Sequence, residues 1–327
     1  MVSELHKFIF EGLPVRGMLV RLTDSWQEVL KRHAQSGGYP QAVTELLGEM
    51  SAAAVLMQGN IKFNGSLILQ VFGDGPVKLA VTEVQPDFAF RTTAKVVGEV
   101  AEGVPLSHLI NVNNTGRCAI TLDPKDRLPG QQPYQGVVPL YGDRREKLER
   151  ISEVLEHYML QSEQLDTRLV LAANDQLAAG LLIQRIPTTG EANLSGTAAA
   201  QAREDAIGRS EDFNRIAILA ASLKREELLT LDADTLLHRL FWQEPLQRFM
   251  PADGVLRPRF ACTCSRERVA NMLQSLGVDE IESILAEQGQ VQIGCDFCGA
   301  QYVFDPVDAA QVFLKRGQQP PSSSQVQ

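Results

Sequence analysis

Two closely spaced cysteine pairs near the end of the sequence constrain this chain more than any other feature. The first pair is Cys262-Thr-Cys264, and after thirty intervening residues comes the second, Cys295-Asp-Phe-Cys298. Two cysteines one or two residues apart can turn their sulfurs toward one point, and two such pairs supply the four thiolates of a tetrahedral Zn²⁺ site. The same thiolates are oxidisable, so each pair could also close a disulfide once the metal has left. The pattern therefore predicts one zinc ion and permits a redox response.

Two other interpretations of these cysteines stay open on spacing alone. The first pair has a single intervening residue, and the gap between the pairs exceeds the roughly 15–20 residues of an ordinary zinc ribbon. Four unrelated core cysteines would rarely fall into two such pairs, so that interpretation is disfavoured. A purely structural zinc ion with no redox role is compatible with the same residues.

Composition limits the class of protein. A length of 327 residues suits two domains joined by a connector, and 44% hydrophobic with 22% charged residues is typical of a soluble globular protein. The formal net charge of −9 argues against a nucleic-acid binder, which would need a basic face. No apolar run is long enough to predict a signal peptide or a membrane span. We therefore expect a cytoplasmic location with no membrane partner, because metal-clustered cysteines are typical of a reducing compartment.

The pattern over residues 1–187 predicts an N-terminal mixed α/β domain of the α+β class, because helices and strands do not alternate regularly. Gly73-Asp-Gly-Pro76 lies between two period-two stretches and predicts a hairpin turn. It lacks the Lys-Ser/Thr of a phosphate loop. Helices are expected over 24–33, 41–58 and 143–164. Strands are expected as a pair within 1–22 and over 62–72, 77–82, 90–97, 117–122, 135–140, 168–172 and 181–186.

Residues 188–258 are predicted to be a linker region, flexible over Thr188–Gly208 and helical after it. The helical part is amphipathic but rich in charge, and it has no core of its own. Isolated helices of this length are marginal in water, so the segment must dock on a neighbour to stay folded. An ordinary domain-bridging helical pair is the alternative. Its apolar positions at helical spacing are Phe213, Ile216, Ala220, Leu223, Leu228, Leu231, Leu236, Leu237, Leu240 and Phe241.

Residues 259–316 are predicted to form a small C-terminal zinc-binding domain with four cysteine ligands, followed by a disordered tail over 317–327. Ser265 is expected to cap one helix, and Asp279 a second that ends at Gly289. A hairpin over 290–304 then places the second cysteine pair on its turn. A domain this small usually needs a disulfide or a structural metal ion to stay folded. Zinc binding contributes about 10–16 kcal/mol of folding free energy to zinc-finger peptides near neutral pH. We therefore expect metal removal to unfold this domain and to undock the helical connector.

The residues around the cysteines resemble a known family. The stretch Phe260-Ala-Cys262-Thr-Cys264-Ser-Arg-Glu-Arg268, then Ser283–Glu287 and Cys295–Cys298, is similar to the redox-regulated heat-shock chaperone family (heat-shock protein thirty-three, the oxidation-activated holdase). The resemblance covers nearly the whole chain, with two departures: Asp166 stands where the family has a proline, and Thr188–Gly208 is longer than the usual junction. Further matching stretches are Gly73–Pro76, Tyr134–Val137, Ser162–Leu165, Thr167-Arg168 and Glu226–Leu231.

The resemblance implies a non-enzymatic, ATP-independent holdase. In the reduced form Cys262, Cys264, Cys295 and Cys298 would hold zinc and the protein would be inactive. Oxidation would pair Cys262 with Cys264 and Cys295 with Cys298, release zinc, and unfold the C-terminal domain and the connector. Exposed apolar surface would then bind unfolding clients, the active form would tend to form a homodimer, and clients would pass to ATP-dependent chaperones. The candidate client-binding residues are Phe213, Ile216, Leu223, Leu228 and Leu231.

Two other functions use the same cysteines. A thiol–disulfide oxidoreductase would use Cys295 and Cys298 as an active dithiol, but its Cys-x-x-Cys would precede a helix in a βαβ setting rather than lie in a hairpin. A basic face would support a zinc-ribbon module for nucleic acid or protein interaction, and the formal net charge of −9 opposes it. Both classes are disfavoured but stay open on the sequence alone.

Other polar and sulfur-bearing residues show no enzymatic pattern. Cys118 has no partner cysteine or histidine nearby and is expected to be a buried small hydrophobe. Arg259, Arg266 and Arg268 could partly offset the negative charge of a four-thiolate site, although solvated surface arginines are equally compatible. The five histidines show no ligand spacing, and no nucleophile elbow or His-Glu-x-x-His motif occurs. The histidines are His6, His33, His108, His157 and His238.

Overall fold

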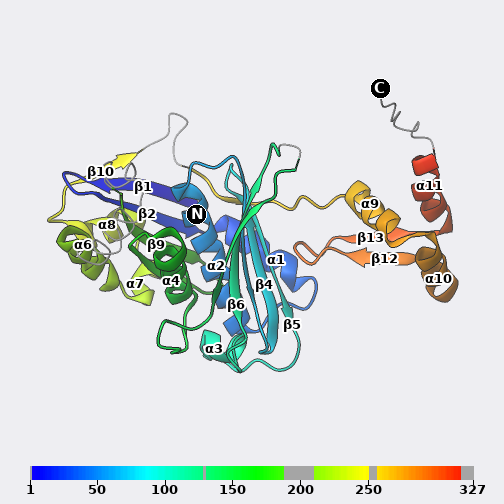
Figure 1. Ribbon diagram of the computed structural model, residues 1–327, viewed down its shortest axis with the longest axis horizontal. Coiled ribbons are helices and arrows are strands. Elements are labelled where there is room, and N and C mark those ends of the chain that lie inside the picture. Colours follow the sequence, from blue (N-terminus) through cyan, green and yellow to red (C-terminus); the bar gives the residue numbers. More distant parts are fainter. Residues whose placement is uncertain (1, 128–129, 188–209, 250–255, 318–327) are drawn as a thin grey trace. The chain divides into compact units, whose positions relative to one another are not determined.

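Figure 1 shows the computed structural model, which describes residues 2–127, 130–187, 210–249 and 256–317. The chain divides into two compact units, Met1–Ala261 and Cys262–Gln327. The connector helices belong to the first unit by this division. The predicted flexible segment Thr188–Gly208 and all but the first residue of the predicted tail lie outside the described residues. The class is α+β, with an N-terminal unit, a helical region and a C-terminal cysteine cluster, as the sequence predicts.

The first unit contains two sheets. Strand order is β10-β1-β2-β9-β8 in the five-stranded sheet and β11-β5-β4-β3-β6-β7 in the six-stranded sheet. Every neighbouring pair is antiparallel except β11 with β5. The strands are β1 Glu4–Phe10, β2 Val15–Leu22, β3 Gly65–Phe72, β4 Val77–Val84, β5 Ala89–Val96, β6 Arg117–Pro124, β7 Tyr134–Pro139, β8 Thr167–Ala173, β9 Ala178–Arg185, β10 Leu246–Phe249 and β11 Arg259–Phe260.

The helix α2 (Gln41–Asn60) is the centre of the first unit's main core. It is buried on all sides from Met50 to Gln58, and it contacts strands of both sheets. A helix that is hydrophobic all round needs neighbours on every side, and α2 finds them by packing against both sheets. The other helices of the N-terminal part are α1 Asp24–Ala34, α3 Leu106–Leu109 and α4 Ile151–Glu163.

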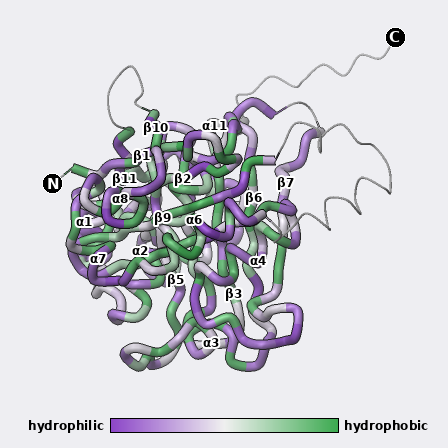
Figure 2. The backbone as a smooth tube through the Cα atoms, turned by 90° about the vertical axis from the view of Figure 1, so that its left-hand side faces the viewer, coloured by the Kyte–Doolittle hydropathy of each residue, from purple (hydrophilic) through white to green (hydrophobic). Residues whose placement is uncertain are grey.

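The helical connector covers the opposite face of the five-stranded sheet from α2. It consists of α6 Glu211–Ala221, α7 Arg225–Thr230 and α8 Ala233–Phe241. Successive side chains of a strand point to opposite faces of the sheet, and Figure 2 shows the backbone coloured by the hydropathy of each residue. Met18 and Val20 enter the core around α2, whereas Leu19 enters a second core with the connector. Both faces of the central strands are therefore buried: β9 is buried along its whole length and β2 at all but one position, whereas the edge strand β10 is largely exposed.

The second unit is small. It consists of α9 Arg266–Leu276, α10 Val278–Gln288, the hairpin β12 Val291–Gly294 with β13 Gln301–Phe304, and α11 Pro306–Gly317. Among its described residues, the buried hydrophobic cluster has five members, which are Leu273, Ile281, Val291, Phe304 and Ala309. A core of that size supplies little stability without a disulfide or a structural metal ion.

Most predicted elements are present, and the differences have local causes. The helix predicted from residue 143 begins only at Ile151, because a tight turn precedes it: Gly142 N–H donates to the Glu146 carbonyl, and Arg145 adopts φ 61°. Asp279 is not the cap of α10, since the helix begins at Val278 after Gly277, whose φ is 97°. The short elements α3, β10 and β11 and the final helix α11 were not predicted.

Candidate metal centre

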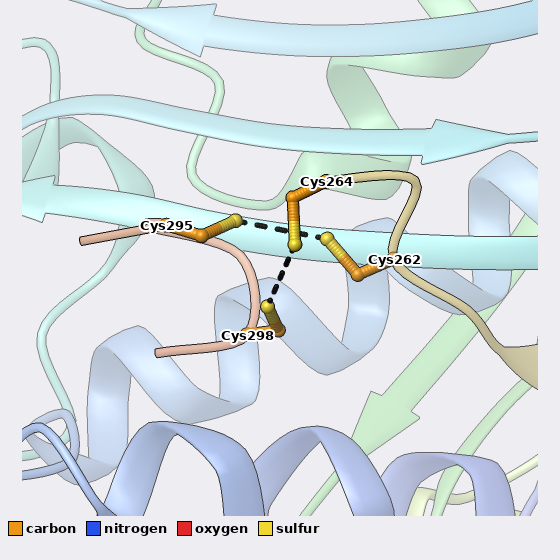
Figure 3. Close-up of side chains that lie close together, drawn as sticks. All are labelled: Cys262, Cys264, Cys295 and Cys298. Carbon is orange, nitrogen blue, oxygen red and sulfur yellow. Dashed lines mark hydrogen bonds between the residues drawn. The ribbon is translucent and has the colours of Figure 1, made fainter. Parts of the chain in front are cut away.

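The four clustered cysteines come from two loops of the second unit (Figure 3). Cys262 and Cys264 lie just before α9, whose start is fixed by Ser265: its hydroxyl accepts a hydrogen bond from the Arg268 amide at 3.2 Å. Cys295 and Cys298 lie on the turn between β12 and β13, as the sequence predicts. Inside that turn the Gly299 amide donates to the Cys295 carbonyl at 2.8 Å.

The four sulfurs converge on one point. All lie within 4.8 Å of one another. The Cys262 and Cys295 sulfurs are 3.6 Å apart, and those of Cys264 and Cys298 are 3.3 Å apart. A tetrahedral Zn²⁺ with bonds of about 2.3 Å would place its sulfur ligands about 3.8 Å from one another. The four residues could therefore hold a metal ion, and an all-sulfur donor set suits zinc.

Burial controls the protonation of the thiols. It raises the pKa of Cys295, and it raises the pKa of Cys298 further, with the neighbouring sulfurs adding to the effect. Cys298 is the most buried of the four, at 5% exposure. Without a metal these two thiols are protonated at neutral pH, so a metal ion must displace protons as it binds.

Tyr302 extends the site beyond the four sulfurs. Its hydroxyl, on β13, donates a hydrogen bond to the Cys264 sulfur at 3.1 Å. This bond is the first cause of the rise in the pKa of Tyr302 to about 12. Hydrogen bonds to ligand atoms orient metal ligands and tune their reactivity. Sequence reasoning missed Tyr302, because an aromatic residue in a strand is more often a packing residue and nothing in its spacing marks it.

The comparisons with known proteins agree on one family. The family model described as "Hsp33 protein" matches residues 3–305. The chain belongs to the Hsp33 family. It is 46% identical to the 33 kDa chaperonin of Chromobacterium violaceum, over 95% of this chain and 94% of that protein, and 43% identical to the 33 kDa chaperonin of Methylobacillus flagellatus over the same shares. The predicted family resemblance is confirmed.

A solved structure agrees on the fold. The crystal structure of the 33 kDa chaperonin from Thermotoga maritima is similar with a TM-score of 0.73. That match covers 97% of this chain and 99% of the other. At 20% sequence identity it supports the fold alone.

In this Hsp33 protein the five candidate client-binding residues lie in the first unit. Phe213, Ile216, Leu223 and Leu228 are buried against the five-stranded sheet, and Leu231 is partly buried beside them. The connector thus docks on a neighbour as its amphipathic pattern predicts. None of the five side chains is available to a client in this arrangement.

The three arginines near the first pair have other contacts. Arg266 pairs with Asp308 at 2.7 Å and lies over the Phe304 ring, and Arg259 pairs with Asp87 at 2.5 Å. Because both charges are already balanced by carboxylates, neither supports the hypothesis that they offset the thiolates. Arg268 is exposed.

Cys118 is separate from the cluster. It lies on β6 with 0% exposure, and burial raises the pKa of its thiol to about 12. A thiol in that state is a poor nucleophile, so its assignment as a buried small hydrophobe is confirmed.

The described part of the chain contains no helix that is both long and apolar enough to cross a membrane.

Proposed function

We propose that this Hsp33 protein is a redox-regulated, ATP-independent holdase that binds unfolding proteins under oxidative stress. The observation that supports the proposal most strongly is the convergence of four sulfurs in a unit whose buried hydrophobic cluster, among its described residues, has only five members. A unit built this way depends on its cysteines for folding, so their oxidation state can decide whether it is folded. The name chaperonin carried by its relatives agrees with a client-binding rather than an enzymatic role.

In the reduced protein, Cys262, Cys264, Cys295 and Cys298 act as the ligands of one zinc ion. When bound, Zn²⁺ keeps the four sulfurs deprotonated and joins the loop before α9 to the β12–β13 turn. Tyr302 donates its hydrogen bond to the Cys264 sulfur and holds that ligand in place. The protein is inactive in this state, since the connector stays docked over its sheet.

Oxidation converts each pair of thiols into a disulfide. One thiolate attacks a peroxide oxygen, the O–O bond breaks, and a sulfenic acid forms with release of hydroxide. The second sulfur of the pair then attacks the sulfenic sulfur, an S–S bond forms, and water leaves. Two peroxide molecules therefore accept four electrons from the four sulfurs, which can no longer act as thiolate ligands.

We assign these disulfides to Cys262 with Cys264 and to Cys295 with Cys298, following the family resemblance. The shortest sulfur contacts run across the pairs, from Cys262 to Cys295 and from Cys264 to Cys298. Since all four sulfurs lie within 4.8 Å, geometry permits all three possible pairings, and disulfide mapping distinguishes them.

The client surface is the apolar interface between the connector and the five-stranded sheet. When the second unit unfolds, the segment that follows the connector, including β10 and β11, loses its folded neighbour, and undocking of the connector then uncovers Phe213, Ile216, Leu223, Leu228 and Leu231. The sheet face beneath, which includes Phe8, Phe10 and Leu19, is uncovered at the same time. Large exposed apolar patches bind unfolded chains and favour self-association, so the active form is a homodimer. Clients then pass to ATP-dependent chaperones in the cytoplasm.

Disulfide mapping combined with a chaperone assay tests this proposal. The reduced, zinc-loaded protein is treated with peroxide at mild heat, its disulfides are mapped by mass spectrometry without reduction, and aggregation of a chemically unfolded client is followed without ATP. We expect the two within-pair disulfides and suppressed aggregation. Crossed disulfides would refute the pairing, and unsuppressed aggregation would refute the function.

A further inference from the structure

The strand that leads into the first cysteine pair occupies the edge of a sheet. β11 adds to β5 in parallel, with Arg259 beside Ala89 and Phe260 beside Phe90. The Arg259 amide donates to the Phe88 carbonyl at 3.1 Å, and the Ala261 amide donates to the Phe90 carbonyl at 3.0 Å. The chain thus uses its own backbone to cover the start of the β5 edge.

Side chains cover the rest of the same edge. His33 bonds to the Thr92 carbonyl at 2.9 Å, and the Tyr39 hydroxyl both donates to the Ala94 carbonyl and accepts from the Ala94 amide, each at 3.0 Å. Unpaired strand edges recruit other chains, and proteins commonly cover them. Here His33 and Tyr39 belong to the N-terminal part of the chain, so they stay beside β5 whatever happens to the second unit. The backbone that covers Phe88–Phe90 is the two-residue strand β11, which directly precedes Cys262.

That cover is held by its two backbone hydrogen bonds, and by a third upstream where the Leu5 amide donates to the Leu256 carbonyl at 3.0 Å, but its side chains add little. Its ion pair, Arg259 with Asp87, has both side chains more than half exposed, so it contributes little. Phe260 is only partly buried against the main core. Phe88, which accepts one of the two hydrogen bonds, is a bulky residue with φ 61°, a conformation that costs stability in a non-glycine residue. Strain of this kind is often found at binding sites.

We propose that the β5 edge at Phe88–Phe90, once β11 has left it, is a strand-addition site for an extended segment of an unfolding client polypeptide. β11 would be a built-in pseudo-ligand that closes this site in the reduced protein. The inference rests on the proposed function, because β11 continues directly into Cys262 and loses its folded neighbour when the second unit unfolds.

Backbone recognition suits such a partner. Hydrogen bonds to main-chain groups do not depend on the client's sequence, and β-strand addition uses mainly these bonds. Folded proteins pair or cover their own strand edges, so a free extended segment distinguishes an unfolding protein from a native one. The position that Phe260 leaves would accept an apolar side chain of the client.

A peptide with the sequence of residues 256–261, Leu-Arg-Pro-Arg-Phe-Ala, tests the site. It is labelled with a fluorophore and amidated, and its anisotropy is measured with the full-length protein in the reduced and the oxidised form. We expect binding at least tenfold tighter to the oxidised form. A matched peptide with an N-methyl group on the alanine amide keeps every side chain but cannot donate to Phe90, and should bind roughly fivefold more weakly.

A full-length variant tests the pseudo-ligand role separately. Phe260→Ala should loosen β11, so the peptide should bind the reduced protein while zinc stays bound. Arg257→Ala, at an exposed position of the same segment, is the matched control: β11 should stay on the β5 edge, and the peptide should not bind the reduced protein.

The client assay separates this inference from the proposed function. In the oxidised protein, an unfolded client should displace the peptide, whereas the same client in its native state should not. Normal suppression of aggregation with no displacement, or equal affinity for the N-methyl peptide, would overturn the strand-addition site and leave the holdase intact. Peptide binding that disappears on dimerisation would assign the edge to a second copy and would also overturn it. Absence of any holdase activity would refute both.

Discussion

Shortening one buried side chain of the connector should activate the chaperone without an oxidant. Ile216 on α6 has 0% exposure and packs in the core shared by the connector and the five-stranded sheet. Ile218 lies two residues away on the same helix at 70% exposure. The pair thus allows one chemical change to be made on the docked face and on the open face of the same element.

The magnitude follows from burial. Replacing a fully buried isoleucine by alanine costs about 2–5 kcal/mol, from lost apolar burial and the cavity left behind. The main core around α2 is a separate cluster, so the loss falls on docking rather than on the rest of the first unit. Even at the lower limit, the undocked fraction should rise roughly 30-fold, since about 1.4 kcal/mol is a factor of ten.

The assay uses reduced, zinc-loaded protein with no peroxide. Ile216→Ala should suppress aggregation of an unfolded client while its zinc stays bound, and Ile218→Ala should behave like the unmodified chain. Exposed substitutions usually change stability by less than about 0.5 kcal/mol. Two results would refute this prediction: Ile216→Ala lowers the thermal midpoint without any chaperone activity, or Ile218→Ala activates equally. Either would mean that undocking of the connector does not expose the client-binding surface.

Three further predictions follow from single side chains. Cys118→Ala should leave zinc binding and activation unchanged, and Cys118 should resist iodoacetamide at pH 8 until the protein unfolds, because burial raises its pKa to about 12; rapid labelling of the native protein would contradict this. Tyr302→Phe removes the hydrogen bond to the Cys264 sulfur, so peroxide should release zinc a few-fold faster with unchanged zinc content, and an unchanged or slower rate would count against a tuning role. Burial raises the pKa of Glu49 from 4.5 to about 7, which Arg225 only partly opposes, so its ionisation destabilises the folded state as pH rises through this window. Glu49→Gln should therefore raise the thermal midpoint at pH 8 and leave it unchanged at pH 4, whereas a lower midpoint at pH 8 would mean that the ion pair with Arg225 outweighs burial.

Local patterns were sufficient for most of the fold. Strand alternation and helical spacing are properties of neighbouring residues, so α2 and the strands of the two sheets other than β10 and β11 could be predicted from them. The four cysteines could be predicted as one site for the same reason, because each pair is local and zinc chemistry requires the pairs to meet. The start of α4 was missed because helical spacing alone does not detect the turn at Gly142–Glu146 that precedes it.

The features that the sequence did not predict depend on long-range contacts. The sequence predicts that the connector must dock but not on which surface, since its partner face comes from strands such as β1 and β9, far away in the chain. β11 has only two residues and becomes a strand solely because the β5 edge lies beside it. Tyr302 gains its role from the distance of its hydroxyl to Cys264, which no spacing rule records.

The most direct test of the redox switch follows zinc release and chaperone activity together in one sample. Peroxide is added to the reduced protein at mild heat, free zinc and client aggregation are recorded, and dithiothreitol with zinc is then added. We predict that one zinc ion per chain leaves as holdase activity appears, and that reduction with zinc reverses both. Zinc that stays bound while the chaperone activates, or that leaves without any activity, would contradict the switch and reduce the four cysteines to a structural staple.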